Sequence, residues 1–191
     1  MTKQLEIKKV KSSDDREITL YKSRTGNTFS AFPPQTFLTF EYWIFMVPQY
    51  KPKNILMLGY AEGTVAGLIR LIWGNVPITA VDIAVPEENR YGVEFIQADA
   101  WEFVKTCQEY DAVLVDLFDN NTGNNCQAVT NPEFIANLSR VGNYLIINSM
   151  GLDMSNYKHL RKIGINKPSE SAVLIYYYET KNKIRGLHPF R

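Results

Sequence analysis

Five continuous apolar runs follow one another between residues 54 and 149, and this pattern constrains the fold more than any other feature of the chain. Unbroken apolar runs are typical of strands that are covered on both faces, whereas strands with one wet face alternate polar and apolar residues. Such strands, separated by crossover segments, form a parallel sheet with helices on each side. We therefore predict an α/β protein with a mainly parallel sheet. The five runs are NILMLG, VPITAVDI, VEFIQAD, DAVLVDLF and NYLIINS.

Two of the crossover segments have the pattern of helices. TVAGLIRLIWG follows the first run, and NPEFIANLSRVG begins at an Asn131-Pro132 step that is typical of a helix start. The link between the second and third runs is different, because only nine residues separate Ile83 from Val93. A parallel connection normally takes about a dozen residues or more. Either this link is an extended loop or one of the two strands is misassigned.

The first 35 residues follow another pattern. Residues 16–32 hold two β-rich runs around the turn signal RTGN, which predicts a hairpin, and LEIKKV before them adds a short strand. We expect residues 1–35 to form a β appendage and residues 36–191 to form the α/β domain. An aromatic helix is expected before Pro48, and SAVLIYYYET is expected to supply a last strand.

The charge distribution argues against a dedicated nucleic-acid binder. Residues 1–24 carry a net charge of +3 and residues 181–191 carry +4, so the formal total of +1 leaves −6 for the middle of the chain. An acidic middle lacks the basic footprint of a nucleic-acid binder and better suits a small cationic ligand. No apolar stretch approaches the roughly 20 residues of a membrane span, and no signal peptide is evident. We expect a cytoplasmic protein with neither nucleic acid nor membrane as partner.

A turn of the sequence GYAEG, residues 59–63, joins the first run to the first expected helix. A strand, glycine turn and helix in this order place backbone N–H groups and the positive helix end beside a nucleotide. Asp82 ends the second run 19 residues after Gly63, close to the roughly 20 expected for a carboxylate that binds ribose. Asp99 ends the third run, where a carboxylate can bind the adenine amino group. The alternative is that these are solvated carboxylates at strand ends.

These segments together resemble the class I S-adenosylmethionine-dependent transferases, and more narrowly the spermidine synthases. The resemblance spans residues 41–149 and rests on ILMLGYAEGTVAGL, AVDI, IQADAWEFV, YDAVLVDLFD and EFIANLSRVGNYLIIN. It implies a three-layer Rossmann-like methyltransferase fold that binds S-adenosylmethionine, or its decarboxylated form, as a group donor without a metal. The residues that it implies for donor binding are Gly59, Glu62, Gly63, Asp82, Asp99 and Ala100.

The position of Glu62 inside the loop favours one of the two donors. Ordinary methyltransferases often carry an acid just before the first loop glycine, where this chain has Leu58, whereas spermidine synthases carry one inside the loop. A carboxylate at Glu62 would repel the carboxylate of S-adenosylmethionine and attract the ammonium of the decarboxylated form. The alternative is an acid in the first turn that complements the helix dipole.

Asp116 and Asp119, in the sequence DLFD, resemble the paired acids that hold and deprotonate the acceptor diamine in spermidine synthases. Aminopropyl transfer needs a neutral amine in line with the carbon next to the sulfonium, and a carboxylate can anchor the cation and then accept its proton. The alternative is that Asp116 is a buried cap and Asp119 a loop residue. The partner implied is a small cationic amine, and a homodimer is left open.

Three interpretations of function therefore stand. The first is an aminopropyltransferase. The second is a methyltransferase acting on a small substrate, which leaves Glu62 unexplained. The third is a non-catalytic descendant that binds a nucleoside or a protein partner. Tyr60, which puts a bulky ring where contact with the donor is expected, and the short link after Ile83 favour the third.

Overall fold

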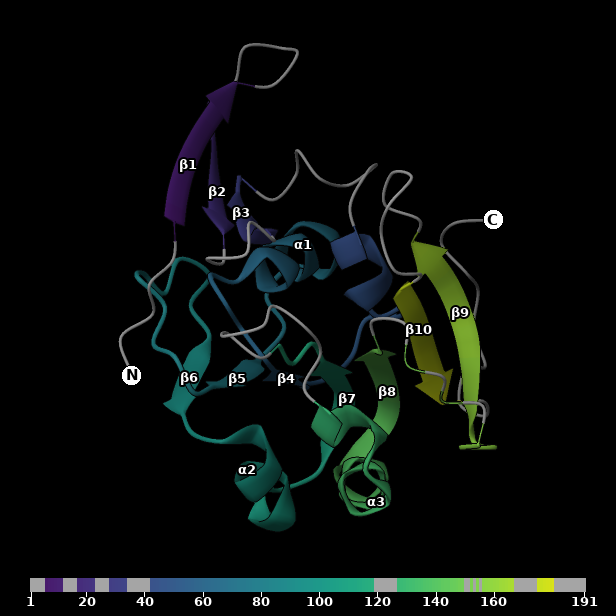
Figure 1. Cartoon of the computed structure of the whole chain (residues 1–191). Coiled ribbons are helices and arrows are strands. Elements are labelled where there is room, and N and C mark those ends of the chain that lie inside the picture. Colours follow the sequence, from purple (N-terminus) through teal and green to yellow (C-terminus); the bar gives the residue numbers. More distant parts are fainter. Residues whose placement is uncertain are drawn as a thin grey trace.

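The computed structural model describes the following residues of the chain: 6–11, 17–22, 28–33, 42–118, 127–149, 152, 154, 156–166 and 175–180. In this part of the chain the strands form two sheets, a large one with helices on both sides and a small one at the N-terminus (Figure 1).

The large sheet has seven strands in the order β6-β5-β4-β7-β8-β10-β9. Each neighbouring pair from β6 to β8 is parallel, and β10 is antiparallel to both β8 and β9. The five apolar runs became β4 to β8, so the predicted α/β class is confirmed. The strands are β4 (Ile55–Leu58), β5 (Ile78–Asp82), β6 (Glu94–Gln97), β7 (Tyr110–Val115), β8 (Gly142–Asn148), β9 (Leu160–Asn166) and β10 (Ile175–Thr180).

Helices cover both faces of this sheet, which makes the domain three layers thick (Figure 1). On β4, Ile55 and Met57 belong to the core beneath α1, whereas Leu56 and Leu58 belong to the core that faces α2 and α3. Both sides of the strand are therefore buried, which is the physical reason for its unbroken apolar run. The helices are α1 (Thr64–Trp73), α2 (Ala100–Thr106), α3 (Pro132–Val141) and the short 3₁₀ helices η2 (Tyr42–Met46) and η3 (Gln127–Thr130).

The helix predictions are confirmed for α1 and α3. The side chain of Asn131 accepts a hydrogen bond from the backbone N–H of Glu133 at 2.8 Å, and Pro132 occupies the first helical position. Asn131 therefore caps α3 as the sequence indicated. The aromatic helix expected before Pro48 is only the short η2 within the described residues. No helix in this described part is both long and apolar enough to cross a membrane.

Residues 83–93 link β5 to β6 without a helix, although the two strands are parallel neighbours. The extended-loop alternative is therefore correct. Side chains hold the loop in place of helical hydrogen bonds. Asn89 bonds the backbone of Val93 in both directions, and Nε of Arg70, on α1, donates to the carbonyl of Tyr91 at 3.0 Å.

The small sheet is antiparallel, with the order β1-β2-β3, and lies on the α1 side of the domain (Figure 1). Its strands are β1 (Glu6–Lys11), β2 (Glu17–Lys22) and β3 (Thr28–Phe32). The predicted hairpin of β2 and β3 is confirmed, and LEIKKV supplies β1. The domain boundary at residue 35 stays a prediction, because residues 34–41 lie outside the described part of the chain.

The C-terminal end of the large sheet was predicted only in part. β10 falls within SAVLIYYYET, as expected, but β9 has the mixed sequence LRKIGIN and was not predicted. Among the described residues, β9 is an edge strand that pairs with β10 alone. An edge strand need not carry a continuous apolar run, so the pattern that revealed the central strands is missing there.

Gly59 provides the first test of this architecture. Its φ is +87°, and a Cβ at this position would lie 2.1 Å from the backbone oxygen of Asp116 on the neighbouring strand end. We expect Gly59→Ala to lower the free energy of unfolding by about 2–5 kcal/mol, because backbone strain and overpacking combine.

The matched control for Gly59→Ala is Gly92→Ala. Gly92 also has a positive φ, +58°, but a Cβ there meets nothing within 4 Å. We expect it to lose only the strain of about 1–2 kcal/mol. Urea denaturation of both variants measures the difference, and equal losses would contradict the close approach of the two strand ends.

Candidate functional site

The carboxyl ends of four parallel strands, β6, β5, β4 and β7, form one edge of the large sheet. Asp99, Asp82, Gly59 and Asp116 lie at these ends or within two residues of them. The structure thus brings together four residues that the sequence singled out. In open α/β sheets, ligands bind outside the carboxyl ends of the strands.

Asp82 joins the two central loops of this edge. Its Oδ2 accepts hydrogen bonds from the backbone N–H groups of Tyr60 at 2.8 Å and Ala61 at 3.0 Å, and its Oδ1 accepts from Ala84 at 2.9 Å. A carboxylate offers about four acceptor positions. Oδ1 therefore keeps capacity for one more donor, such as a ribose hydroxyl, while the rest of the group fixes the loop after β4.

Asp99 is the N-cap of α2. Its Oδ1 accepts from the backbone N–H groups of Trp101 at 2.7 Å and Glu102 at 3.2 Å. The side chain is exposed, and its Oδ2 makes no hydrogen bond among the described residues. The cap thus holds the carboxylate in place and leaves one oxygen available to an amino group. Ala100, which follows, is buried at the start of the helix.

Ile83 is a candidate that the sequence interpretation missed. It was placed in the second apolar run, yet β5 ends at Asp82 and Ile83 is 54% exposed. Val85, two residues further on, is 56% exposed. Large apolar side chains beside carboxylates give a flat aromatic base a surface to lie on. The sequence contained a signal for this, because Asp82 ends the strand and the residue after it, Ile83, therefore lies outside the sheet.

Glu62 lies in the loop between β4 and α1 and is only 3% exposed. Its Oε2 accepts a hydrogen bond from the backbone N–H of Glu87 at 3.0 Å. It precedes Gly63, the N-cap of α1, which provides no side-chain cap. A buried carboxylate needs compensating donors, and here the helix start and the N–H of Glu87 contribute to this. Glu62 therefore also ties the loop after β4 to residues 83–93.

Tyr60 does not place its ring at the ligand edge, which corrects the interpretation of this residue as an obstruction. The side chain is buried in the α1-side core, where its ring centroid lies 5.8 Å from that of Phe95. A Cβ at Gly63 would lie 2.4 Å from the Tyr60 hydroxyl, so the ring explains why position 63 is glycine. Burial raises the pKa of Tyr60 strongly, with a smaller contribution from the nearby Tyr91, and the phenol stays neutral.

Asp116 is positioned by a residue that the sequence interpretation also missed. Its Oδ1 accepts a hydrogen bond from Nδ2 of Asn148 at 2.7 Å. Asn148 is buried and ends β8, the strand beside β7. The signal in the sequence was a polar residue that ends the apolar run NYLIIN. Asp119 lies outside the described residues, so its pairing with Asp116 stays a prediction.

No family model matches the chain, and no curated protein matches it.

Among the described residues, no three His, Cys, Asp or Glu side chains gather closely enough to hold a metal ion.

Several solved structures share the fold. A probable spermidine synthase from Corynebacterium glutamicum aligns with a TM-score of 0.65 at 14% identity, over 94% of this chain and 78% of its own. A spermidine synthase in complex with the transition state analogue AdoDATO gives 0.55 at 13%, over 92% and 70%. Human methyltransferase-like protein 13 in complex with SAH gives 0.51 at 14%, over 76% and 81%. The chain has the fold that these proteins share, the class I S-adenosylmethionine-dependent methyltransferase fold. The two spermidine synthase alignments each cover more than 90% of this chain, so they extend into the N-terminal sheet.

Asp82 has two roles in this geometry, and a substitution should reveal both. We expect Asp82→Ala to weaken the binding of methylthioadenosine, a ligand that contains the adenosine portion of both donors, by about 1–3 kcal/mol, because the ribose loses its acceptor and the loop after β4 loses its anchor. Asp82→Asn should be milder. Calorimetric titration measures the affinity, and urea denaturation measures the stability.

The control for Asp82→Ala is Asp111→Ala. Asp111 also accepts a backbone N–H, that of Lys53 at 2.8 Å, but it lies at the start of β7 and therefore at the opposite edge of the sheet. This variant should lose stability without a change in ligand affinity. An unchanged dissociation constant in Asp82→Ala would show that the ribose interpretation is wrong.

Tyr60→Phe tests whether the ring is purely structural. The hydroxyl is buried and has no hydrogen-bond partner among the described residues, so its removal should leave the free energy of unfolding unchanged or raise it by up to about 1 kcal/mol. Tyr60→Ala should lower it by about 3–5 kcal/mol, as for other large core residues. A loss of methylthioadenosine affinity in Tyr60→Phe would show that the hydroxyl reaches the ligand after all.

Proposed function

We propose that this protein is an aminopropyltransferase-like enzyme that binds decarboxylated S-adenosylmethionine and a cationic amine acceptor. The observation that carries the proposal is how the backbone N–H groups and the charge of the loop after β4, residues 59–63, are arranged. Four of its five backbone N–H groups are bonded within the protein, while Glu62 adds a buried carboxylate. A loop with at most one spare donor and with a negative charge suits an ammonium better than a carboxylate. The four bonded N–H groups belong to Gly59, Tyr60, Ala61 and Gly63.

The remaining parts of the edge fit the adenosine portion of the donor. Asp82 would accept a ribose hydroxyl through Oδ1, and Asp99 would accept the adenine amino group through Oδ2. Ile83 would cover one face of the base. The donor chain would then run toward Glu62, where the decarboxylated molecule carries only an ammonium. This assignment uses acceptor capacity and exposed apolar surface that the described residues leave available.

The acceptor amine would bind beside Asp116. β4 and β7 are neighbours, and the N–H of Asp116 donates to the carbonyl of Leu58 at 2.8 Å, so the donor loop and the acceptor carboxylate adjoin. Asn148 holds one oxygen of Asp116 and fixes the orientation of the carboxylate. We assign Asp119 to the same amine, as the second of the paired acids.

The reaction follows from this placement. The carboxylate of Asp116 first anchors the ammonium and then accepts its proton, which gives a neutral amine. The amine nitrogen attacks the propyl carbon beside the sulfonium and forms a C–N bond. The C–S bond breaks, its electron pair stays on sulfur, and the neutral thioether methylthioadenosine leaves.

A second candidate is an S-adenosylmethionine-dependent methyltransferase with a small substrate. The hydrogen bond from the N–H of Glu87 to Glu62 favours it, because it gives this carboxylate a structural role at the start of α1. In that case Asp82, Asp99 and Ile83 keep their contacts with adenosine, and Glu62 supports only the loop.

Glu62→Gln separates the two candidates. With the charge removed, we expect the ratio of affinities for decarboxylated over parent S-adenosylmethionine to fall by about tenfold to a hundredfold, since a partly screened charge pair a few ångströms apart is worth up to about 4 kcal/mol before desolvation. Calorimetric titration with both donors measures the ratio. Methylthioadenosine carries neither charged group and serves as the control ligand.

The control variant is Glu109→Gln, an exposed carboxylate that directly precedes β7 and therefore lies at the opposite edge of the sheet. It should leave all three affinities unchanged. Equal weakening of the three ligands by Glu62→Gln would instead assign Glu62 to the loop and put the methyltransferase ahead. No binding by any of them to the folded protein would favour a non-catalytic descendant.

A further inference from the structure

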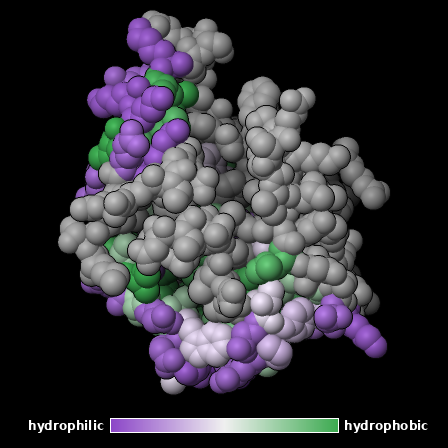
Figure 2. All heavy atoms as spheres, viewed as in Figure 1, coloured by the Kyte–Doolittle hydropathy of each residue, from purple (hydrophilic) through white to green (hydrophobic). Residues whose placement is uncertain are grey.

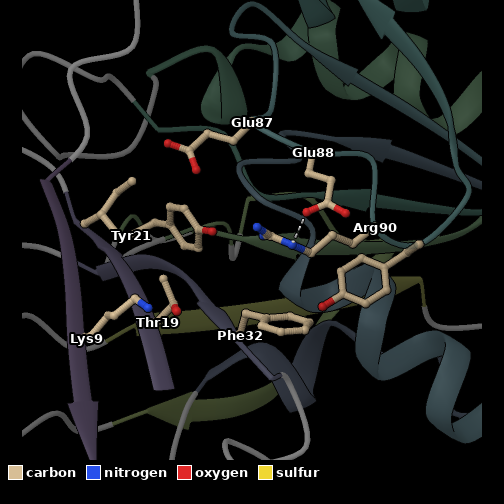
Figure 3. A pocket seen from close by; sticks show the side chains of 9 residues that line it. Lys9, Thr19, Tyr21, Phe32, Glu87, Glu88 and Arg90 are labelled. Carbon is tan, nitrogen blue, oxygen red and sulfur yellow. Dashed lines mark ion pairs between the residues drawn. The ribbon is translucent and has the colours of Figure 1, made fainter. Parts of the chain in front are cut away.

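An open groove of about 650 Å³ lies between the small N-terminal sheet and residues 83–93 (Figure 3). Its walls come from two segments far apart in the chain, with Tyr21 and Phe32 on one side and Glu87 and Arg90 on the other. The volume is in the range of small-molecule sites. Glu87 connects the groove to the edge of the large sheet, because its N–H bonds Glu62 while its side chain lines the groove.

We propose that this groove binds an organic cation, whose ammonium pairs with Glu87 and whose apolar body lies along the exposed side chains of Phe32 and Ile7 on the N-terminal sheet. The groove is separate from the position of Asp116.

Arg90 connects the two walls of the groove. The guanidinium carbon lies 5.0 Å from the ring centroid of Phe32 and 5.7 Å from that of Tyr21. Nε of Arg90 pairs with Glu88 at 2.9 Å. Burial lowers the pKa of Arg90, but the proximity of Tyr21 and the charge of Glu88 outweigh it and raise this pKa. A cation held over two rings fixes the separation of the walls, so little ordering is left for a ligand to induce.

The wall that carries Glu87 is also fixed. Its backbone is held by the bond to Glu62, by the contacts of Asn89 with Val93, and by Arg70 on the carbonyl of Tyr91. The carboxylate therefore stands on a loop fastened on both sides of it. Such preorganisation favours binding, since the loop loses little freedom when a ligand arrives.

The unpaired charge that reaches the groove is negative. Lys9 pairs with Glu17 at 2.9 Å and Arg90 pairs with Glu88, whereas Glu87 is exposed and has no charged partner among the described residues. Nη1 of Arg90 lacks a hydrogen-bond partner, but this atom is buried. A ligand entering from solvent therefore meets the carboxylate of Glu87 first, and this favours a cation.

Apolar surface supplies the second half of the recognition. Ile7 is 48% exposed and Phe32 is 39% exposed, and both line the groove. Figure 2 shows apolar surface beside hydrophilic residues over the N-terminal sheet. Exposed large apolar side chains rimmed by polar groups are typical of ligand-binding grooves. A ligand with a charged head and an apolar body matches this arrangement.

The test uses the whole chain, labelled with ¹⁵N, and titrates it with n-hexylammonium while amide shifts are followed by NMR. We expect a dissociation constant of about 1 mM, in line with the size of the probe, and shifts centred on residues 87–91 and β2. Glu87→Gln should weaken binding about fivefold, the upper range for a partly exposed ion pair. The control Glu109→Gln removes an exposed carboxylate that follows α2, and it should change nothing.

Two further probes, one neutral and one anionic, and two variants can contradict the proposal. Binding of 1-hexanol or hexanoate as tight as that of n-hexylammonium would overturn the assignment of a cation. Shifts confined to the neighbourhood of Asp116 and Asn148, lost in Asp116→Asn and unchanged in Glu87→Gln, would overturn the groove while supporting an amine at the proposed acceptor position.

Discussion

The carboxylate of Asp82 is the interaction on which the shape of the candidate site depends. It accepts two backbone N–H groups from the loop after β4 and one from the loop after β5. One of the donors is Ala61, whose φ of +52° is unusual for a residue with a side chain. A left-handed conformation of this kind costs about 1–2 kcal/mol, and the hydrogen bond to Asp82 offsets part of this cost. The same bonds consume N–H groups that would otherwise be available to an anionic ligand, so one contact sets both the loop conformation and the charge that it prefers.

Residues 83–93 link β5 to β6 as an extended loop in place of a crossover helix, and this loop connects several parts of the structure. Residues 83–93 are close enough to the neighbouring elements to contact three of them. The backbone N–H of Glu87 donates to Glu62 in the loop after β4. Arg90 lies over rings of the N-terminal sheet, and the carbonyl of Tyr91 accepts a hydrogen bond from Arg70 on α1. The segment therefore links the small sheet to the edge that we assign to the donor. Tyr60 fits this arrangement, because its ring is buried in the α1-side core beside Phe95 on β6.

The charged residues of the site, and not the fold, distinguish the two proposed functions. Spermidine synthases and methyltransferases share the architecture, and low identity to both leaves the choice to the residues. Glu62 in the loop and Asp116 on the neighbouring strand end place two carboxylates where a donor tail and an acceptor would meet. Each is held by a group of the protein, the N–H of Glu87 and the amide of Asn148. This preorganisation is what a transfer between two cationic reactants would require, since carboxylates that are already oriented need little rearrangement during the reaction.

The sequence by itself determined the parallel core and the position of the edge. Strands covered on both faces must be apolar throughout, so β4 to β8 could be identified, and a capped start at Asn131 marked α3. The acids at the ends of these runs had to share one edge once the strands were parallel. Only the tertiary structure decided that Tyr60 turns into the core, that Ile83 is exposed, that Asn148 holds Asp116, and that Glu62 meets Glu87. It also revealed β9 and the groove beside Arg90. These features depend on contacts between residues far apart in the chain, and the local pattern of polar and apolar residues does not predict which distant groups come together.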